Sequence, residues 1–181
     1  MNIIIRNCLF YSVAYDNQKN ILCRIKISLF GNRVSYIYDS DNKLRYITKI
    51  LINKDTSKHR DNCKYQITKV DSGTKTIVGI ADLDYMSLKE GNIEKEFYFR
   101  PPMINKLVLH LSSNNHKLRI YLKRDGSCFI KNEEDTIIGC IKKQKRYVSI
   151  DMKVDTLDIF LVCAIFELSR YLDAENEFVL V

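Results

Sequence analysis

The chain has 181 residues and a mass of 21.3 kDa, a length that favours one domain able to bury about two thirds of its unfolded surface. With 46% hydrophobic residues, 28% charged residues, 6 Gly and 2 Pro, its composition excludes collagen-like and low-complexity sequences. The formal net charge of +7 favours anionic neighbours such as nucleic acid, phospholipid headgroups or acidic proteins, without choosing among them.

The amino terminus, MNIIIRNCLF, has no basic segment before its isoleucines and no small-residue cleavage site, so we predict no secretory signal. The cysteines are scattered singly, without the paired or compact spacing of a zinc site or a disulfide framework. They are Cys8, Cys23, Cys63, Cys128, Cys140 and Cys163. We therefore expect reduced, mostly buried thiols and a cytoplasmic protein.

Most of the chain alternates apolar and polar residues with the period of a half-buried strand. In ILCRIKISL, Ile21, Cys23, Ile25, Ile27 and Leu29 share one face, and the same period recurs in KLRIYLK from Lys117 and in RYVSIDM from Arg146. Turn-forming residues interrupt the pattern at Asp16, Asp39, Asp71, Arg124 and Asn132. The pattern predicts about twelve strands between Asn7 and Met152, connected as antiparallel hairpins.

Two pairs of segments resemble each other within the chain. YDNQKNILCRIK from Tyr15 is similar to YDSDNKLRYITK from Tyr38, and TIVGI from Thr76 recurs as TIIGC from Thr136. Matches this short arise either by chance or because the sheet is built from two related halves.

A hydrophobic helix is predicted over residues 156–172, after the last strand. Asp155 is the expected N-cap, with Thr156 as the competing choice, and Asp158 lies where a carboxylate meets free backbone N–H groups. From Ile159 to Phe166 there is no polar side chain, so the helix must be enclosed by protein or by lipid.

Enclosure by protein is the favoured alternative. A membrane span needs about twenty predominantly apolar residues, whereas Asp158, Glu167 and Arg170 interrupt this run. A curled sheet of about twelve strands has an interior too wide for its own side chains to fill. We therefore predict a mainly β protein, a closed antiparallel barrel over about residues 7–152 around a central C-terminal helix, as one domain over 1–181.

The strand rhythm with its D-x-x-(G/N) turns, the TIVGI and TIIGC segments and the near-terminal VDTLDIFLVCAIFELS resemble the tubby C-terminal-like superfamily, specifically its LURP-one-related branch, which includes the phospholipid scramblases. The resemblance covers nearly the whole chain and implies a twelve-stranded barrel closed around a central helix. The tail AENEFVLV departs from the pattern; we expect residues 178–181 to fold back as a strand or to cover a barrel mouth.

Enzymatic motifs and metal-ligand spacings are absent from the sequence, so we predict a non-enzymatic protein without cofactor or metal. His110 is interpreted as a core or rim histidine, and His59 and His116 as loop residues. Asp82 and Asp84 are either a carboxylate or calcium-ligand pair or, more commonly, caps and turn residues. Scramblases are associated with calcium through acidic residues near the corresponding helix, but Asp151, Asp155 and Asp158 lack the dense spacing of a calcium loop, and capping explains two of them.

Basic residues at predicted turns are the main functional indication. Tubby domains bind phosphoinositide headgroups through Lys and Arg, so the resemblance implies an anionic headgroup site, which we assign to Lys123, Arg124, Lys142, Lys143, Lys145 and Arg146. The alternative is that basic hairpin tips serve solubility and edge protection. A further basic segment, NKDTSKHRDNCK from Asn53, is predicted to be a loop.

The predicted function is a binding or regulatory module, cytoplasmic or peripheral at a membrane, with an anionic membrane lipid as ligand. A protein-interaction scaffold without a small ligand is the alternative. Nucleic acid is not expected, because Phe129 alone is no stacking platform and Tyr121 is not at a diagnostic spacing.

Overall fold

The computed structural model describes residues 1–8, 11–28, 34–51, 64–85, 104–112, 117–123, 126–153 and 157–177, with the side chains of 84, 85, 104, 105 and 174–177 left out. Several predictions of the sequence lie outside the described residues. They concern Cys63, the loop from Asn53, His59, His116, Arg124, Asp155, Thr156 and the tail 178–181.

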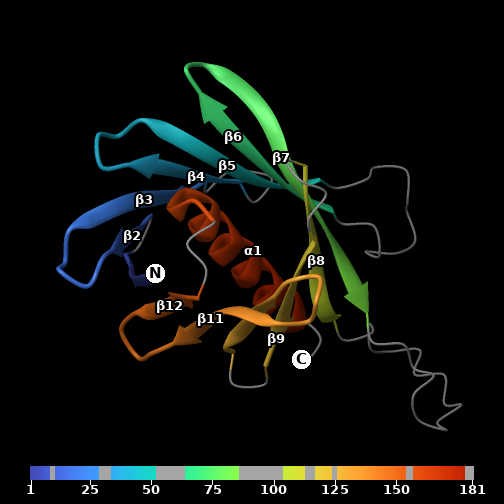
Figure 1. Ribbon diagram of the computed structural model, residues 1–181. Coiled ribbons are helices and arrows are strands. Elements are labelled where there is room, and N and C mark those ends of the chain that lie inside the picture. Colours follow the sequence, from blue (N-terminus) through green and yellow to red (C-terminus); the bar gives the residue numbers. More distant parts are fainter. Residues whose placement is uncertain are drawn as a thin grey trace, which may run out of the picture.

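Twelve antiparallel strands form one closed barrel in which each strand pairs with its neighbours in the chain and the first pairs with the last (Figure 1). The strands are β1 (Asn2–Asn7), β2 (Tyr11–Tyr15), β3 (Ile21–Ile27), β4 (Val34–Asp39), β5 (Leu44–Leu51), β6 (Lys64–Asp71), β7 (Thr74–Tyr85), β8 (Ile104–Leu111), β9 (Lys117–Leu122), β10 (Cys128–Lys131), β11 (Ile137–Lys143) and β12 (Val148–Met152). The predicted fold class is confirmed. Closure leaves no edge strand free to pair with another chain.

The first strand begins earlier than predicted. Strand β1 starts at Asn2, whereas the sequence interpretation began the barrel near residue 7. Ile3 and Ile5 are fully buried while Ile4 between them is only partly so, and Ile5 pairs with Val148 across the closing ladder. The run of three isoleucines conceals this alternation, because the outward position is apolar too.

Helix α1 (Ile159–Glu177) lies inside the ring of strands (Figure 1). Residues 162–169 are all buried, which confirms the predicted enclosure. The helix begins later and ends later than the predicted 156–172. Its N-cap is Asp158, whose Oδ1 accepts the Phe160 N–H at 2.7 Å and whose carbonyl accepts the Val162 N–H at 3.0 Å. Within the described residues, no helix has the length and hydrophobicity needed to cross a bilayer.

Three hairpins, β2–β3, β4–β5 and β10–β11, share one turn geometry. In each turn a side-chain oxygen of the first residue accepts the backbone N–H of the residue four positions later, and the fourth residue adopts a left-handed backbone conformation. The first residues are Asp16, Asp39 and Asn132, and the fourth are Lys19 (φ 66°), Asn42 (φ 62°) and Asp135 (φ 60°). The similarity of the segments from Tyr15 and Tyr38 therefore has a structural counterpart.

The TIVGI and TIIGC segments occupy equivalent positions. In β6–β7 the register shifts beside Gly79, and in β10–β11 it shifts in the same way beside Gly139. The extra residues, Val78 and Ile138, each present a carbonyl to a backbone N–H beyond the following strand, at 2.9 and 2.8 Å. Both segments are β-bulges that bend the wall. This equivalence favours two related halves over a chance match.

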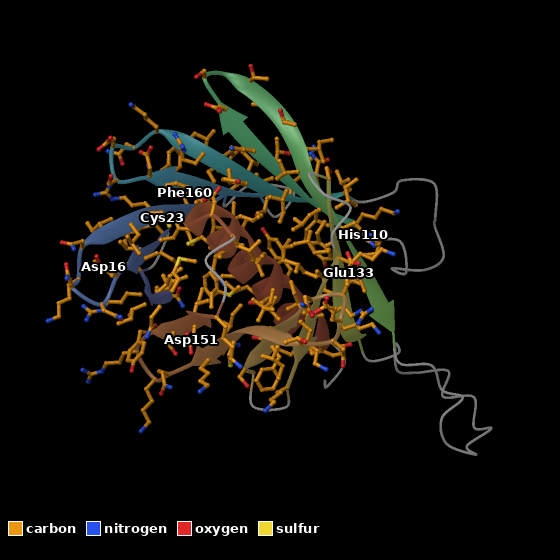
Figure 2. All side chains as sticks on the ribbon, in the orientation of Figure 1. Asp16, Cys23, His110, Glu133, Asp151 and Phe160 are labelled. Atoms are coloured by element: carbon orange, nitrogen blue, oxygen red, sulfur yellow. The ribbon has the colours of Figure 1, made fainter. Side chains whose placement is uncertain are left out.

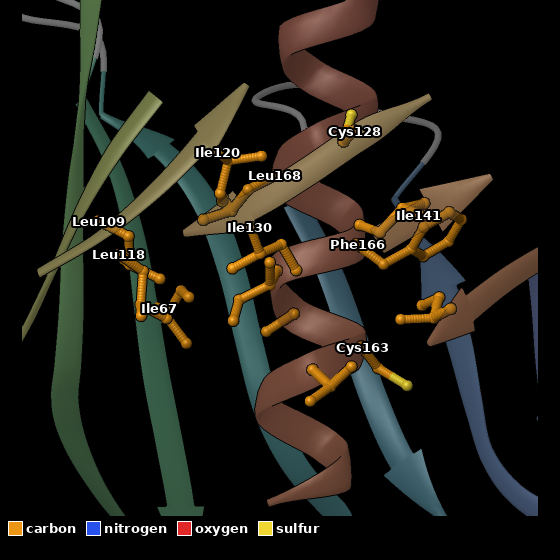
Figure 3. Close-up of a cluster of buried hydrophobic side chains, with 14 of the residues drawn as sticks. Ile67, Leu109, Leu118, Ile120, Cys128, Ile130, Ile141, Cys163, Phe166 and Leu168 are labelled. Carbon is orange, nitrogen blue, oxygen red and sulfur yellow. The ribbon is translucent and has the colours of Figure 1, made fainter. Parts of the chain in front are cut away.

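The inward faces of the strands and the helix form one hydrophobic core (Figure 3). Cys23, Ile25, Leu118, Ile120, Val148, Ile150 and Met152 are buried as the alternation predicts. Ile21 differs and is 38% exposed. The β2–β3 register shifts between Ala14 and Tyr15, so Ile21 falls out of phase with Cys23.

Candidate functional site

Among the described residues, a cavity lies at the tip of the β11–β12 hairpin, against the second half of α1. Its volume is about 610 Å³, within the range typical of small-ligand sites. It is lined by Asn7, Lys143, Gln144, Lys145, Arg146, Tyr147, Val148, Phe166, Arg170 and Asp173. We call it the hairpin pocket. Hairpin and helix together form it, so neither element alone makes the site.

The hairpin pocket is lined by four cations and one carboxylate. Lys143 forms an ion pair with Asp173, and Arg170 donates to Glu167 at 3.0 Å. Lys145 and Arg146 are exposed, and among the described residues neither has a carboxylate within ion-pair distance. Two of the four cations are therefore available to an anion without breaking an existing pair.

A buried polar cluster lies behind Arg170. Glu167 is only 1% exposed and accepts a hydrogen bond from the Ser35 hydroxyl at 2.7 Å as well as from Arg170. The Tyr171 hydroxyl lies 3.2 Å from that of Ser35, and the Tyr171 ring stacks on Tyr65. Burial, more than any other cause, raises the pKa of Tyr171 above its usual value. Glu167, itself bonded to Ser35, thus orients Arg170 at the pocket.

Two aromatic residues contribute to the hairpin pocket at different depths. Phe166 is 2% exposed and extends from α1 beside Ile141 of β11 (Figure 3). Tyr147 is 40% exposed at the end of the hairpin. The pocket thus has an apolar base, a cationic wall and an exposed aromatic residue at the entrance.

Three of the six predicted basic residues, Lys143, Lys145 and Arg146, line the hairpin pocket. Lys142 is exposed on the same hairpin but is not part of the lining. Lys123 lies at the neighbouring β9–β10 turn with its Nζ 4.1 Å from the centroid of the Phe129 ring. Gly126 of that turn approaches the Lys143 side chain, so this turn flanks the pocket without lining it.

The residues on the helical side of the pocket were not predicted from the sequence. Phe166, Arg170 and Asp173 follow one another at the spacing of one helix face, and they include charges that end the apolar run. That spacing was a usable signal. No feature of the sequence indicated Asn7, at the end of β1, because it lies beside the hairpin only once the barrel has closed.

No protein-family model, curated protein or solved structure matches this chain. What the protein binds is therefore inferred from the geometry and charge of the hairpin pocket.

The other candidate residues do not converge on a site. Asp82 and Asp84 lie within β7, not at a turn as predicted. Asp82 pairs with Lys64 at 3.2 Å and lies 3.8 Å from His110, whose side chain is 45% exposed, so of the two predicted positions for this histidine, core or rim, the core is wrong. Strand register explains this, since His110 follows the inward Leu109. Among the described residues, no group of three or more His, Cys, Asp or Glu side chains could hold a metal ion.

Proposed function

We propose that the protein is a non-enzymatic binding module of the LURP-one-related, tubby-like kind, and that the hairpin pocket holds the anionic headgroup of a membrane phospholipid. The observation that carries this proposal is the concave cavity in which Lys145 and Arg146 have no carboxylate partner among the described residues. The closed twelve-stranded barrel around a helix agrees with what the sequence resemblance implies.

A phosphate group is the anion that best suits this lining. Arg146 and Arg170 present planar guanidinium forks that bind phosphate oxygens in pairs, and Lys145 adds a mobile point charge. Arg170 is already oriented by Glu167, which lowers the entropy lost when it binds a ligand. Gln144 and Asn7 add neutral hydrogen-bonding groups suited to hydroxyls.

A membrane setting is favoured by the position of Tyr147. This ring is exposed between Arg146 and the buried Val148, on a hairpin that also carries Lys142. Tyrosine and basic residues are the side chains that favour the level of lipid headgroups, where the ring is partly apolar and the cations meet anionic lipid. A protein-interaction scaffold is the second candidate, and its binding surface would not need a concave cationic cavity.

Vesicle co-sedimentation tests the proposal. We expect the wild-type protein to sediment with phosphatidylcholine vesicles containing a few per cent of a phosphoinositide, and to remain in solution with phosphatidylcholine alone. The double variant Lys145→Glu, Arg146→Glu should lose at least about tenfold in affinity, because two attractive contacts become repulsive. Raising the ionic strength should weaken wild-type binding.

The matched control is Lys43→Glu, Lys75→Glu, which changes the net charge equally. Both lysines are exposed beside the β4–β5 and β6–β7 turns, at the end of the barrel opposite to the β11–β12 hairpin. This control should retain most of the binding. Equal losses in the two double variants would point to general charge attraction, and wild-type retention on neither vesicle would exclude the headgroup and favour the scaffold.

A further inference from the structure

The central helix touches the barrel wall through a pair of thiols. The Sγ atoms of Cys23 on β3 and Cys163 on α1 are 3.2 Å apart, and both residues are fully buried. Figure 3 shows the Cys163 side chain directed away from the helix axis, and Figure 2 labels Cys23 on the strand beside the helix. The two residues are 140 positions apart in sequence. Their contact is therefore a product of the closed fold.

We propose that Cys23 and Cys163 are a disulfide-forming pair that, when oxidised, fastens the central helix covalently to the barrel wall. A disulfide has an S–S bond of about 2.05 Å, so the sulfurs need to approach by little more than 1 Å from their 3.2 Å separation. A change of this size is within reach of small rotations about the cysteine side-chain bonds. The sequence gives no sign of the pair, since neither cysteine has a partner nearby in the chain.

The reaction requires an oxidant, for which a low-molecular-weight disulfide such as oxidised glutathione suffices. One cysteine thiolate attacks the oxidant and releases one glutathione thiol, leaving a mixed disulfide. The second cysteine then attacks the protein sulfur of that mixed disulfide and releases the second glutathione thiol. The two cysteines together lose two protons and two electrons, which the oxidised glutathione accepts.

Burial controls when this reaction takes place. In the closed barrel neither sulfur is accessible, and the hydrogen bond with Cys23 together with desolvation raises the pKa of Cys163 well above its usual value. The thiols therefore resist oxidation until the barrel opens locally or during folding, when an oxidant can enter. Once formed, the bond is shielded from reductants in the same way.

Oxidation should matter to the hairpin pocket because the same helix supplies Phe166, Arg170 and Asp173. Cys163 lies about one turn before Phe166, so a bond at Cys163 fixes the axial position of these residues. The bond would also close a very long loop, the case in which cross-links restrict the unfolded chain most. We thus expect the oxidised form to be the more stable one.

Peptide mapping of the full-length protein tests the proposal directly. The reduced protein is incubated with oxidised glutathione, both in buffer and while refolding from urea, then alkylated and digested with trypsin without reduction. The expected product joins peptide 20–24, NILCR, to peptide 154–170, VDTLDIFLVCAIFELSR. It should form faster at sub-denaturing urea than in buffer. The oxidised protein should melt about 5 °C or more above the reduced one, reversibly with reductant.

The single variants Cys23→Ala and Cys163→Ala are the controls, and both should lose the linked peptide and the rise in melting temperature together. Cys128 and Cys140 provide an internal comparison, because they lie on the neighbouring strands β10 and β11 but pair with Ile141 and Phe129 instead of with each other. Absence of the 20–24/154–170 product under both conditions, or linkage of other cysteines in equal yield, would overturn the proposal. A linked protein with an unchanged melting temperature would overturn its stabilising role.

Discussion

Lys143 of β11 and Asp173 of α1 form an ion pair at the hairpin pocket, so a carboxylate of the central helix occupies the place beside Lys143 that a ligand anion would need. Their side chains are 44% and 19% exposed, which places the pair at the boundary with solvent. An anionic ligand must therefore compete with Asp173 for the lysine. The helix thus contributes repulsion as well as attraction to the pocket.

Replacing this carboxylate should strengthen binding. We expect Asp173→Asn to raise the affinity for phosphoinositide-containing vesicles about two- to fivefold, because a partly exposed ion pair is worth up to about 1 kcal/mol. The measurement is a vesicle titration of wild type and variant at one ionic strength. Asp151→Asn is the matched control, since Asp151 is exposed on β12 and the net charge changes equally (Figure 2).

The comparison distinguishes two hypotheses: that Asp173 competes with the ligand, and that the hairpin pocket binds the headgroup at all. If Asp173→Asn and Asp151→Asn bind alike while the wild type binds well, the pocket takes the headgroup without competition from Asp173. If none of the three binds, the headgroup proposal itself is wrong.

A side chain added at Gly139 in the TIIGC bulge is expected to clash with Met152. A Cβ built there would lie 2.3 Å from the Met152 sulfur and 3.3 Å from Ile130 Cδ1, inside the packed core. Gly139→Ala should therefore destabilise the protein by about 1–3 kcal/mol in urea unfolding, the cost of overpacking. Gly79→Ala at the equivalent bulge should cost less, because its nearest contact is Leu109 Cδ1 at 3.0 Å.

Shortening Met152 should relieve the clash with the new methyl group. In the double variant Gly139→Ala, Met152→Ala, the total loss of stability should be smaller than the sum of the two single losses, because the new methyl group fills part of the space vacated by methionine. Strictly additive losses would show that the cost of Gly139→Ala arises elsewhere, in the backbone of the bulge.

The fold was predictable because its strongest determinants are local. Alternation in β3, β9 and β12 and the capped apolar run of α1 are periodic patterns that one sequence displays in full. The errors occurred where pattern is weak. Strand β1 was hidden by the outward-facing Ile4, and the helix start was placed at Asp155 because several acidic residues there could serve as a cap.

The hairpin pocket was only half predictable. A basic hairpin is visible as the string KKQKR, which led to Lys143, Lys145 and Arg146. The twist of the hairpin and the depth of α1 in the barrel determine which of these residues face the cavity. Neither can be predicted from the local sequence. The Cys23–Cys163 contact is the extreme case, because only closure of the sheet around the helix brings the two sulfurs together.

The buried carboxylate of Glu167 should depend on Arg170 for its stability. We expect Arg170→Met to lower the free energy of unfolding by about 2–3 kcal/mol, less than for a fully buried pair, because Arg170 is 36% exposed and Ser35 still donates to Glu167. Glu167→Gln in the Arg170→Met background should recover part of this loss. Urea unfolding of the four proteins in a double-mutant cycle measures the coupling.

An exposed ion pair provides the control for that cycle. Lys131 contacts Asp135 at 2.7 Å across the β10–β11 turn, where Asp135 is 57% exposed. Lys131→Met should have a much smaller effect than Arg170→Met, because water replaces the lost partner. Comparable losses at the two sites would indicate that Glu167 is not specially dependent on its arginine.

Tyr46 ties the wall to the start of the helix and should make stability sensitive to alkaline pH. Its hydroxyl donates to the Asp158 carboxylate at 2.6 Å, and burial, followed by this hydrogen bond, raises the pKa of Tyr46 well above its usual value of 10.0. Tyr46→Phe should cost about 1.5–3 kcal/mol at pH 7, the range for a hydrogen bond to a charged group.

The pH dependence of that difference follows from linkage. The phenol stays neutral in the folded protein while it ionises near pH 10 in the unfolded chain, so its contribution is complete below pH 10 and declines as the pH rises toward the folded pKa. The gap between wild type and Tyr46→Phe should be constant from pH 6 to about 9 and narrow above 10. Urea unfolding of both proteins under reducing conditions measures it, and a gap that stays constant or widens to pH 11 would show that the Tyr46 hydroxyl is not held neutral by the barrel.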